Sequence, residues 1–287
     1  MATGWEDLEL VDVGEGRFTT TITDPWRLAV APQGGVVAAI AVRAMERLLG
    51  HSEQTLRTFT AMFAGVVQGG TVEVEVEVLR SGRSMSQLTA TVRNPGAHAG
   101  LTALAAFGAP RRGFEFTELV LPDVPGPDDL RGYRDPLPEG IDFEFDGDPF
   151  PFWERVIDCR PAMGRPVWEP FEAGPGEAAF WYRLDHPPLT ASGHLDVGGA
   201  IVLCDTMPSP IGQKLGPKSG SWFAPSVDFT FHAFRPATPG WLLSHQRAHH
   251  AGAGYASVDG ALWDPRGEDG PTLVAYATQV MLFTFPK

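Results

Sequence analysis

The chain has 287 residues and a formal net charge of −13, and 43% of its residues are hydrophobic. This length fits one large domain or two ordinary ones, with enough apolar side chains for a core. The acidic balance argues against binding nucleic acid or an anionic membrane surface through a global positive field. The chain has two cysteines, Cys159 and Cys204, and no apolar run of about 18 residues. We therefore expect a cytoplasmic protein without disulfides or membrane insertion.

The first part of the chain predicts two strands and then a long helix. Residues 18–23 and 26–30 are rich in β-branched and aromatic side chains, which is typical of strands. After a turn at residues 32–35, apolar residues recur at helical spacing as far as Leu48. Gly50 is a natural stop for this helix.

From residue 55 to residue 107 the apolar residues recur every second position. In residues 71–78 every second residue is a valine, so the valines face a core and the acids between them face water. Two more strands are predicted at residues 84–93 and 101–107.

Residues 111–149 are rich in Pro, Asp and Gly, and we expect an irregular linker there. Strand patterns resume after it and surround one short helix that is capped by Asp196 and closed by Pro208. The predicted strands after the linker are residues 152–159, 178–184, 226–234, 241–250, 256–263 and 273–285.

The short helix places a carboxylate beside an apolar stripe. Asp205 follows Ile201 by four residues, so its side chain lies on or next to that stripe. Burying an unpaired carboxylate is costly, which leaves two interpretations. Asp205 is either a functional group with a partner, or it reaches solvent or a backbone N–H from the edge of the stripe.

The two halves of the chain repeat the same landmarks at nearly constant offsets of 164 and 170 residues. The corresponding landmarks are Gly34-Gly35 with Gly198-Gly199, Gly70 with Gly240, and Gly82 with Gly252. The repeat predicts an N-terminal unit at residues 1–110 and a C-terminal unit at residues 150–287, joined by the linker. One helix with four to six antiparallel strands in each unit is an α+β architecture.

Together with the repeated Gly-Gly helix, three stretches of the second half resemble the double-hotdog acyl-CoA thioesterases of the thioesterase II type. The stretches are AIVLCD at residues 200–205, APSVDFTFH at 224–232 and LVAYATQ at 273–279. The resemblance implies a double hotdog, in which two curled antiparallel sheets each wrap around one central helix and can pair edge to edge. It also implies that the C-terminal unit carries the active site.

The resemblance implies three catalytic residues, Asp205, Ser226 and Gln279. Asp205 would activate a water molecule that Ser226 and Gln279 position, and backbone N–H groups at residues 34–35 or 198–199 would polarise the thioester carbonyl. Ala41 and residues 105–107 at the corresponding places of the first half carry no polar set, so one site per chain and a structural first half are expected.

The implied substrate is an acyl-CoA, and the implied role lies in fatty acid and lipid metabolism. CoA would be part of the substrate, with no cofactor and no metal. A homo-oligomer, either a dimer or a larger assembly, is compatible with the resemblance, and nothing indicates acyl chain length.

The residues themselves leave alternatives for two of the three roles. Alternation along residues 226–232 would place four polar side chains on one strand face, and any of them could be the functional group. These four are Ser226, Asp228, Thr230 and His232. Gln279 could instead be a structural amide bonded to backbone groups.

Other functions are also open. A non-catalytic acyl-CoA or acyl-ligand binding protein would use the same fold. A hotdog hydratase would need an acid where Leu189 stands, five residues before His194. No G-x-S-x-G or phosphate-loop motif occurs. His245 and His249 could share a strand face, but hydrated histidines explain them better than a metal pair.

Overall fold

The computed structural model describes residues 5–50, 53–141, 150–166, 168–169, 172–216, 219–267 and 270–286. The strands in these ranges are β1 Val11–Gly14, β2 Arg17–Ile22, β3 Arg27–Leu28, β4 Ala31–Pro32, β5 Thr55–Phe63, β6 Gly70–Arg80, β7 Met85–Arg93, β8 Leu101–Gly108, β9 Ile157–Met163, β10 Glu177–Leu184, β11 Asp228–Ala233, β12 Leu242–Gly252, β13 Tyr255–Asp264 and β14 Thr272–Leu282. The helices are α1 Gly34–Leu49, α2 Pro151–Arg155, α3 Val197–Cys204 and α4 Ser209–Leu215, with 3-10 turns η1 Trp5–Leu8, η2 Asp24–Trp26 and η3 Pro127–Asp129.

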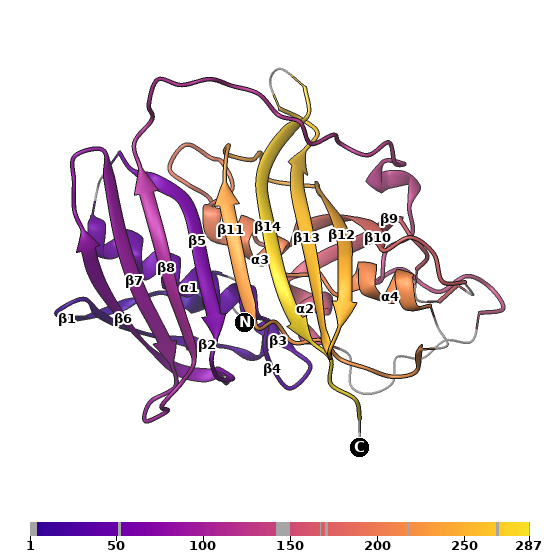
Figure 1. Cartoon of the computed structure of the whole chain (residues 1–287), viewed down its shortest axis with the longest axis horizontal. Coiled ribbons are helices and arrows are strands. Elements are labelled where there is room, and N and C mark those ends of the chain that lie inside the picture. The colour runs from indigo at the N-terminus through magenta and orange to yellow at the C-terminus, as the bar shows by residue number, and fades with distance from the viewer. Residues whose placement is uncertain are drawn as a thin grey trace.

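The sheet is continuous, where the sequence predicted two. Within the described residues, twelve antiparallel strands follow the order β1-β2-β6-β7-β8-β5-β11-β14-β13-β12-β10-β9 (Figure 1). β5 pairs with β11 in the middle, with Thr60 opposite Thr230. Two separate sheets would each leave an edge of unpaired N–H and C=O groups, and this pairing satisfies both edges.

The strand order is symmetric about the β5–β11 pair. β8, β7, β6, β2 and β1 follow on one side, and β14, β13, β12, β10 and β9 follow on the other. The repeat seen in the sequence therefore has a structural counterpart, in which β5 corresponds to β11 and β8 to β14. The architecture is α+β, with much more strand than helix.

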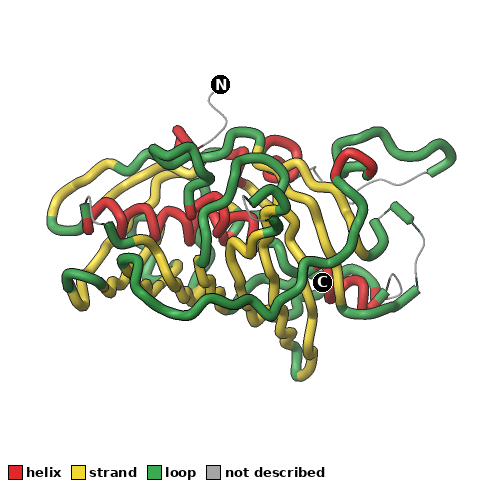
Figure 2. The backbone as a smooth tube through the Cα atoms, turned by 90° about the horizontal axis from the view of Figure 1, so that it is seen from above, coloured by secondary structure: helices red, strands yellow, loops and turns green. Residues whose placement is uncertain are grey.

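Helices α1 and α3 lie on the same side of the sheet, with α1 behind the β5–β8 strands and α3 behind β11 and β14 (Figures 1 and 2). They pack against each other, and the start of α1 lies beside the end of α3. A Cβ atom on Gly198, at the start of α3, would lie 3.4 Å from the Cβ atom of Ala39 on α1. The glycine thus lets the two backbones approach closely.

The prolines mark the main differences from the predicted elements. Residues 152–159 were predicted as one strand, but Pro151 starts the short helix α2 and the strand β9 begins only at Ile157. Pro208 and Pro210 were expected only to end a helix, yet α4 begins at Ser209. Proline fits the first turn of a helix, where its missing N–H has no partner to lose.

The proline-rich segment after β8 crosses the outer face of the sheet (Figure 1). Its residues Leu121, Val124 and Leu130 pack against a cluster that includes Trp181 and Trp263. The Nε1 atom of Trp181 donates a hydrogen bond of 2.8 Å to the carbonyl of Pro125. Residues 142–149 of the predicted linker lie outside the described residues. No described helix is long and apolar enough to cross a bilayer.

Candidate active site

Asp205 is the residue at which α3 ends. Its backbone N–H still donates to the carbonyl of Ile201 at 3.1 Å, so the residue caps the helix with its side chain directed off the last turn. The residue is only 9% exposed. The sequence placed Asp205 beside the apolar stripe, and the structure confirms that the carboxylate is removed from solvent.

The structure brings the three predicted site residues together. The Nε2 atom of Gln279, on β14, donates to the carboxylate of Asp205 and also to the Oγ atom of Ser226, the latter at 3.1 Å. An ionised carboxylate can only accept hydrogen bonds, so the NH₂ group of the amide must face it. Gln279 therefore bridges the acid at the end of α3 and the hydroxyl that precedes β11.

Ser226 reaches Gln279 because the strand alternation expected for residues 226–232 does not hold. β11 begins only at Asp228, whose Oδ1 atom accepts the N–H of Val280 at 2.6 Å. Thr230 lies instead on the exposed side, where its hydroxyl is 3.2 Å from that of Thr60. Ser226 and its predicted alternatives Asp228 and Thr230 thus have different surroundings.

His232, the fourth candidate on this stretch, lies further along β11, opposite Tyr276. It is four positions from Asp228 along β11, and Tyr276 is three positions from Gln279 along β14. The structure pairs only Ser226 of the four with Gln279.

The N-terminal half completes the surroundings of Asp205, although the sequence suggested a structural role for it apart from the N–H groups at residues 34–35. Gln33 is 1% exposed, and its Nε2 atom donates to the backbone carbonyls of Asp205 at 2.6 Å and Val202 at 3.2 Å. Its Oε1 atom accepts the N–H of Val36 and so caps α1. Gln33 ties the start of α1 to the end of α3.

Gly35 in the first turn of α1 donates its backbone N–H to the carboxylate of Asp205. A Cβ atom at this position would lie 2.9 Å from the Cβ atom of Asp205, so the contact requires glycine. Of the two Gly-Gly pairs in the sequence, the pair at residues 34–35 is the one beside the acid. Gln33 was missed because it looked like a turn residue, but its place before this helix is a recognisable N-cap position.

Burial raises the pKa of Asp205 from its ordinary value of 3.8 to about 7. The hydrogen bonds from Gln279 and from the Gly35 N–H oppose this rise because they favour the ionised form. The positive end of the α1 dipole acts in the same direction. A carboxylate with a pKa near neutrality is well suited to accept and return a proton at neutral pH.

The amide oxygen of Gln279 is buried and has no hydrogen-bond partner among the residues that the structure describes. Leaving a buried acceptor unpaired costs about 1–3 kcal/mol. A water molecule bonded to this oxygen and to the carboxylate of Asp205 would satisfy both groups. The arrangement can therefore hold a water molecule beside a base.

A second buried polar cluster begins at the next residue. The Nε2 atom of Gln246 donates to the hydroxyls of Thr206 at 3.2 Å and Ser244 at 3.0 Å, and the Thr206 hydroxyl donates to the carbonyl of Leu203. These contacts fix the chain immediately after Asp205. The sequence gave no sign of this cluster, since Gln246 lies in a strand with several exposed polar residues.

The histidines considered as metal ligands each contact a carboxylate of their own. His245 lies 2.7 Å from Glu177, and His249 lies 2.8 Å from Asp259. Across the ranges that the structure covers, no three histidine, cysteine or acidic side chains are grouped as a metal site.

Comparisons with known structures show the fold. A hot dog fold protein of unknown function from Alicyclobacillus acidocaldarius is 26% identical, with a TM-score of 0.78 over 99% of this chain and 98% of the other. The acyl-CoA thioesterase II TesB2 from Mycobacterium marinum is 20% identical, with a TM-score of 0.75 over 99% and 98% of the two chains. The tesB protein of Mycobacterium avium subs paratuberculosis is 19% identical, with a TM-score of 0.75 over 98% of each chain.

The sequence itself also matches family descriptions over most of its length. Residues 22–108 match the acyl-CoA thioesterase N-terminal domain, and residues 127–283 match the acyl-CoA thioesterase C-terminal domain. A comparison with curated protein sequences gave no match. Because the two matched segments cover most of the chain, it belongs to the acyl-CoA thioesterase family.

Proposed function

We propose that this chain hydrolyses acyl-CoA thioesters with a water molecule that Asp205 activates. The observation that carries the proposal is the Gln279 side chain, which contacts both Asp205 and Ser226 and has a free amide oxygen in a buried site. Membership of the family supports thioester hydrolysis in general, and the geometry supports the roles proposed for these residues.

In the proposed reaction, Asp205 takes a proton from water while the water oxygen bonds to the thioester carbonyl carbon. Gln279 and Ser226 orient that water, which is a positioning contribution. In the first turn of α1 the N–H of Gly35 is bonded to Asp205 and that of Val36 to Gln33, so the N–H of Gly34 and the positive end of the helix dipole would stabilise the oxygen that becomes negative. The carbon–sulfur bond then breaks, and the CoA sulfur leaves as a thiol with the proton held by Asp205.

The pKa of Asp205 gives this mechanism a pH dependence. The base must be ionised, and its pKa of about 7 means that the ionised fraction rises through neutrality. The value of kcat/KM should therefore rise with pH between about 6 and 8.

The test is a panel of acyl-CoAs that differ in chain length, assayed for release of free thiol. Asp205→Asn and Gln279→Ala should each lower kcat by about 100-fold, the scale of lost acid–base or positioning catalysis. The matched controls are Glu77→Gln, which also changes a carboxylate to an amide, and Gln87→Ala, which also removes an amide. Both residues lie at exposed strand positions, and both variants should keep the parent rate.

A parent protein that releases no thiol from any substrate would overturn the proposal. If that protein still bound a non-hydrolysable acyl-CoA analogue, a non-catalytic acyl-ligand binding protein would be the better description. Full activity of Gln279→Ala would instead leave Gln279 as a structural amide.

A further inference from the structure

The symmetry of the sheet defines a place equivalent to the Asp205 site at the other end of the β5–β11 pair. There the start of β5 takes the place of the start of β11, and the N-terminus of α3 takes the place of the N-terminus of α1. The structure has a cavity of about 430 Å³ at this place. Its volume lies in the range of small-molecule pockets. We call it the inner cavity, and its apolar lining includes Leu56, Ala200, Phe231, Ala233 and Val274.

The inner cavity has lost the side chains that characterise the Asp205 site. Thr60 and Thr230 lie opposite each other and correspond to each other in the symmetry of the sheet. Leu56 and Ser226 each precede one of these residues by four positions, so Leu56 takes the place of Ser226. The neighbouring strands pair Thr60 with Leu104 and Thr230 with Thr278, so Ala105 takes the place of Gln279. This end of the fold therefore lacks the hydroxyl and the amide that would position water in the Asp205 site.

The N-terminus of α3 also differs from that of α1, because its cap is a carboxylate instead of a neutral amide. The Oδ1 atom of Asp196 accepts the N–H of Gly198 at 2.8 Å and so caps the helix with a carboxylate of its own. In α1 the cap is the neutral side chain of Gln33, and the Gly35 N–H is left for Asp205. The inner cavity can accommodate a ligand, but it lacks counterparts of Ser226 and Gln279 beside a carboxylate.

Basic side chains lie at the mouth of the inner cavity. The half-buried Arg57 is held by a hydrogen bond from its Nε atom to the carbonyl of Gly108 at 3.1 Å. Arg235 forms an ion pair of 3.1 Å with Glu115, and both side chains are largely exposed, at 58% and 83%. Such a pair contributes little stability, so an anionic ligand can replace Glu115 at low cost.

The mouth also carries acids. Asp196 is already bonded to the N–H of Gly198. Burial, and then the nearby charge of Asp196, raise the pKa of Glu46 to about 7, while Arg43 opposes the rise. Near neutrality Glu46 is therefore partly protonated, which lessens its repulsion of an anion.

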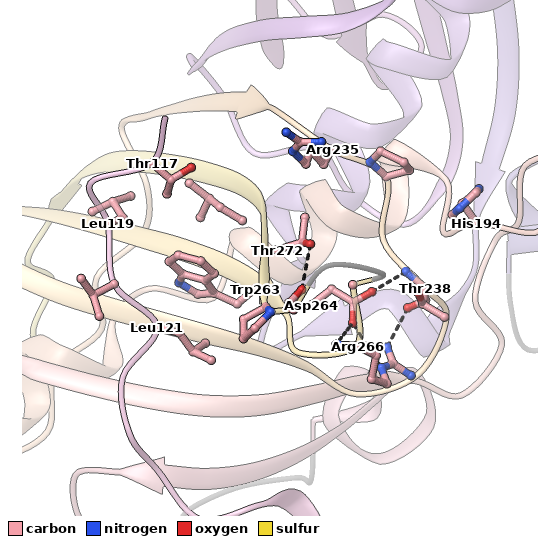
Figure 3. Close-up of a pocket in the computed structure, with 16 residues that line it drawn as sticks. Thr117, Leu119, Leu121, His194, Arg235, Thr238, Trp263, Asp264, Arg266 and Thr272 are labelled. Carbon is pink, nitrogen blue, oxygen red and sulfur yellow. Dashed lines mark hydrogen bonds and ion pairs between the residues drawn. The ribbon is translucent and has the colours of Figure 1, made fainter. Parts of the chain in front are cut away.

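A second, outer cavity of about 730 Å³ adjoins the inner one, and Arg235, Pro236 and His194 line both. It lies between the linker segment at residues 117–121 and the end of β13 near Trp263. Figure 3 shows Trp263 together with Leu119 and Leu121 on one side of this space and His194 on the other. A ligand can thus extend from the apolar inner cavity past Arg235 into a more polar space.

We propose that the inner and outer cavities form a second, non-catalytic site for an acyl chain with an anionic head group. The hydrocarbon chain lies in the inner cavity, and Arg57 and Arg235 bind the carboxylate or phosphate oxygens, as guanidinium groups do well. The ligand class rests on the proposed function, since a free fatty acid is its product and an acyl-CoA its substrate. Both share the chemistry of an apolar chain joined to an anion.

The test is cross-linking with a ten-carbon fatty acid that carries a photoreactive diazirine, followed by mass spectrometry of the peptides. We expect labels in residues 190–200 and 231–237 in addition to any label near Asp205. Decanoate and decanoyl-CoA are added separately as competitors, and protection by either one supports the site and identifies its source. Labelling confined to the neighbourhood of Asp205, or protection by neither competitor, would overturn the proposal.

Two variants test the geometry of the site. Ala233→Trp fills the inner cavity and should reduce labelling of these segments by tenfold or more, whereas Ala251→Trp on an exposed strand end should not. Arg235→Glu should weaken protection by about tenfold because it removes a charged hydrogen bond from an exposed position. Arg83→Glu in an exposed turn is its matched control.

The experiment separates this inference from the proposed function. Labelling at residues 190–200 and 231–237 without thiol release by the parent protein would support the second site and overturn the thioesterase. Thiol release with no label in those segments would do the reverse. Unchanged labelling in both Ala233→Trp and Arg235→Glu would also overturn the second site.

Discussion

Replacing Asp205 by Asn should change the pH dependence of stability as well as activity. The pKa of Asp205 is about 7 in the folded protein because of burial, against 3.8 as its ordinary value. Between these values the unfolded chain has lost this proton while the folded chain still holds it. Ionisation therefore favours unfolding as pH rises, and this one group lowers the free energy of unfolding by about 1.4 kcal/mol per pH unit over the interval.

The difference of about three between the two pKa values corresponds to about 4 kcal/mol. Asn does not titrate, so the stability of Asp205→Asn minus that of the parent should rise by about 4 kcal/mol from pH 4 to pH 7 and then level off. Any penalty that does not depend on pH, such as an Asn amide facing the N–H of Gly35, is the same at pH 4 and pH 7. It therefore cancels from the change in the stability difference between these two pH values.

Urea unfolding at intervals of half a pH unit measures this difference directly. Glu77→Gln, which removes an exposed carboxylate from β6, is the control for the loss of one negative charge. A difference that stays constant within about 1 kcal/mol from pH 4 to pH 8 would contradict the reasoning. It would mean that the folded protein ionises Asp205 as easily as the unfolded chain does, and that the proposed base is not tuned by burial.

Substitutions at three further residues test the neighbours of this carboxylate. Gln279→Glu places a second carboxylate against Asp205, so one pKa should rise and the activity profile should move to higher pH, whereas Gln279→Ala should lose activity without that displacement. Gly35→Ala brings a Cβ atom to 2.9 Å from that of Asp205 and should lower kcat by about tenfold, measured by thiol release, with Gly113→Ala as a control in open space. Gln33→Leu leaves two buried carbonyls without their donor and should lower the free energy of unfolding by about 2 kcal/mol, and an unchanged urea midpoint would show that water replaces the amide.

The elements with a clear period could be predicted from the sequence. The stripe ending at Leu48 predicts α1, and the alternating valines predict β6, because each pattern depends only on the residues inside the element. Edge-to-edge pairing of the two sheets was considered possible, but the strands that join them could not be predicted, since the pairing depends on two strands about 170 residues apart finding each other. Residues 152–159 were misassigned because proline at a helix start and proline at a strand edge look alike.

The site likewise contains residues that the sequence indicates and residues whose place depends on the tertiary structure. Asp205 and Gln279 stood out because each is a polar residue in an apolar pattern, but the resemblance implied the roles of all three residues, Ser226 included. The strand face of Ser226 was predicted wrongly because Asp228 interrupts the alternation by bonding to a backbone N–H, which no period reveals. Gln33 and Gly35 were not recognised as neighbours of the acid, because their proximity to Asp205 depends on how α1 and α3 cross.

The β5–β11 pairing has a consequence for cutting the chain in two. Asp205, Ser226 and Gln279 belong to one fragment, and Gln33 and Gly35 belong to the other, so a break near residue 113 divides the proposed site without removing any of these residues. Neither piece alone can present a helix start to the carboxylate. Recovered turnover on mixing would then report the rejoining of the two central strands, and fusing each piece to one of two interacting proteins would turn the chain into a sensor of their association.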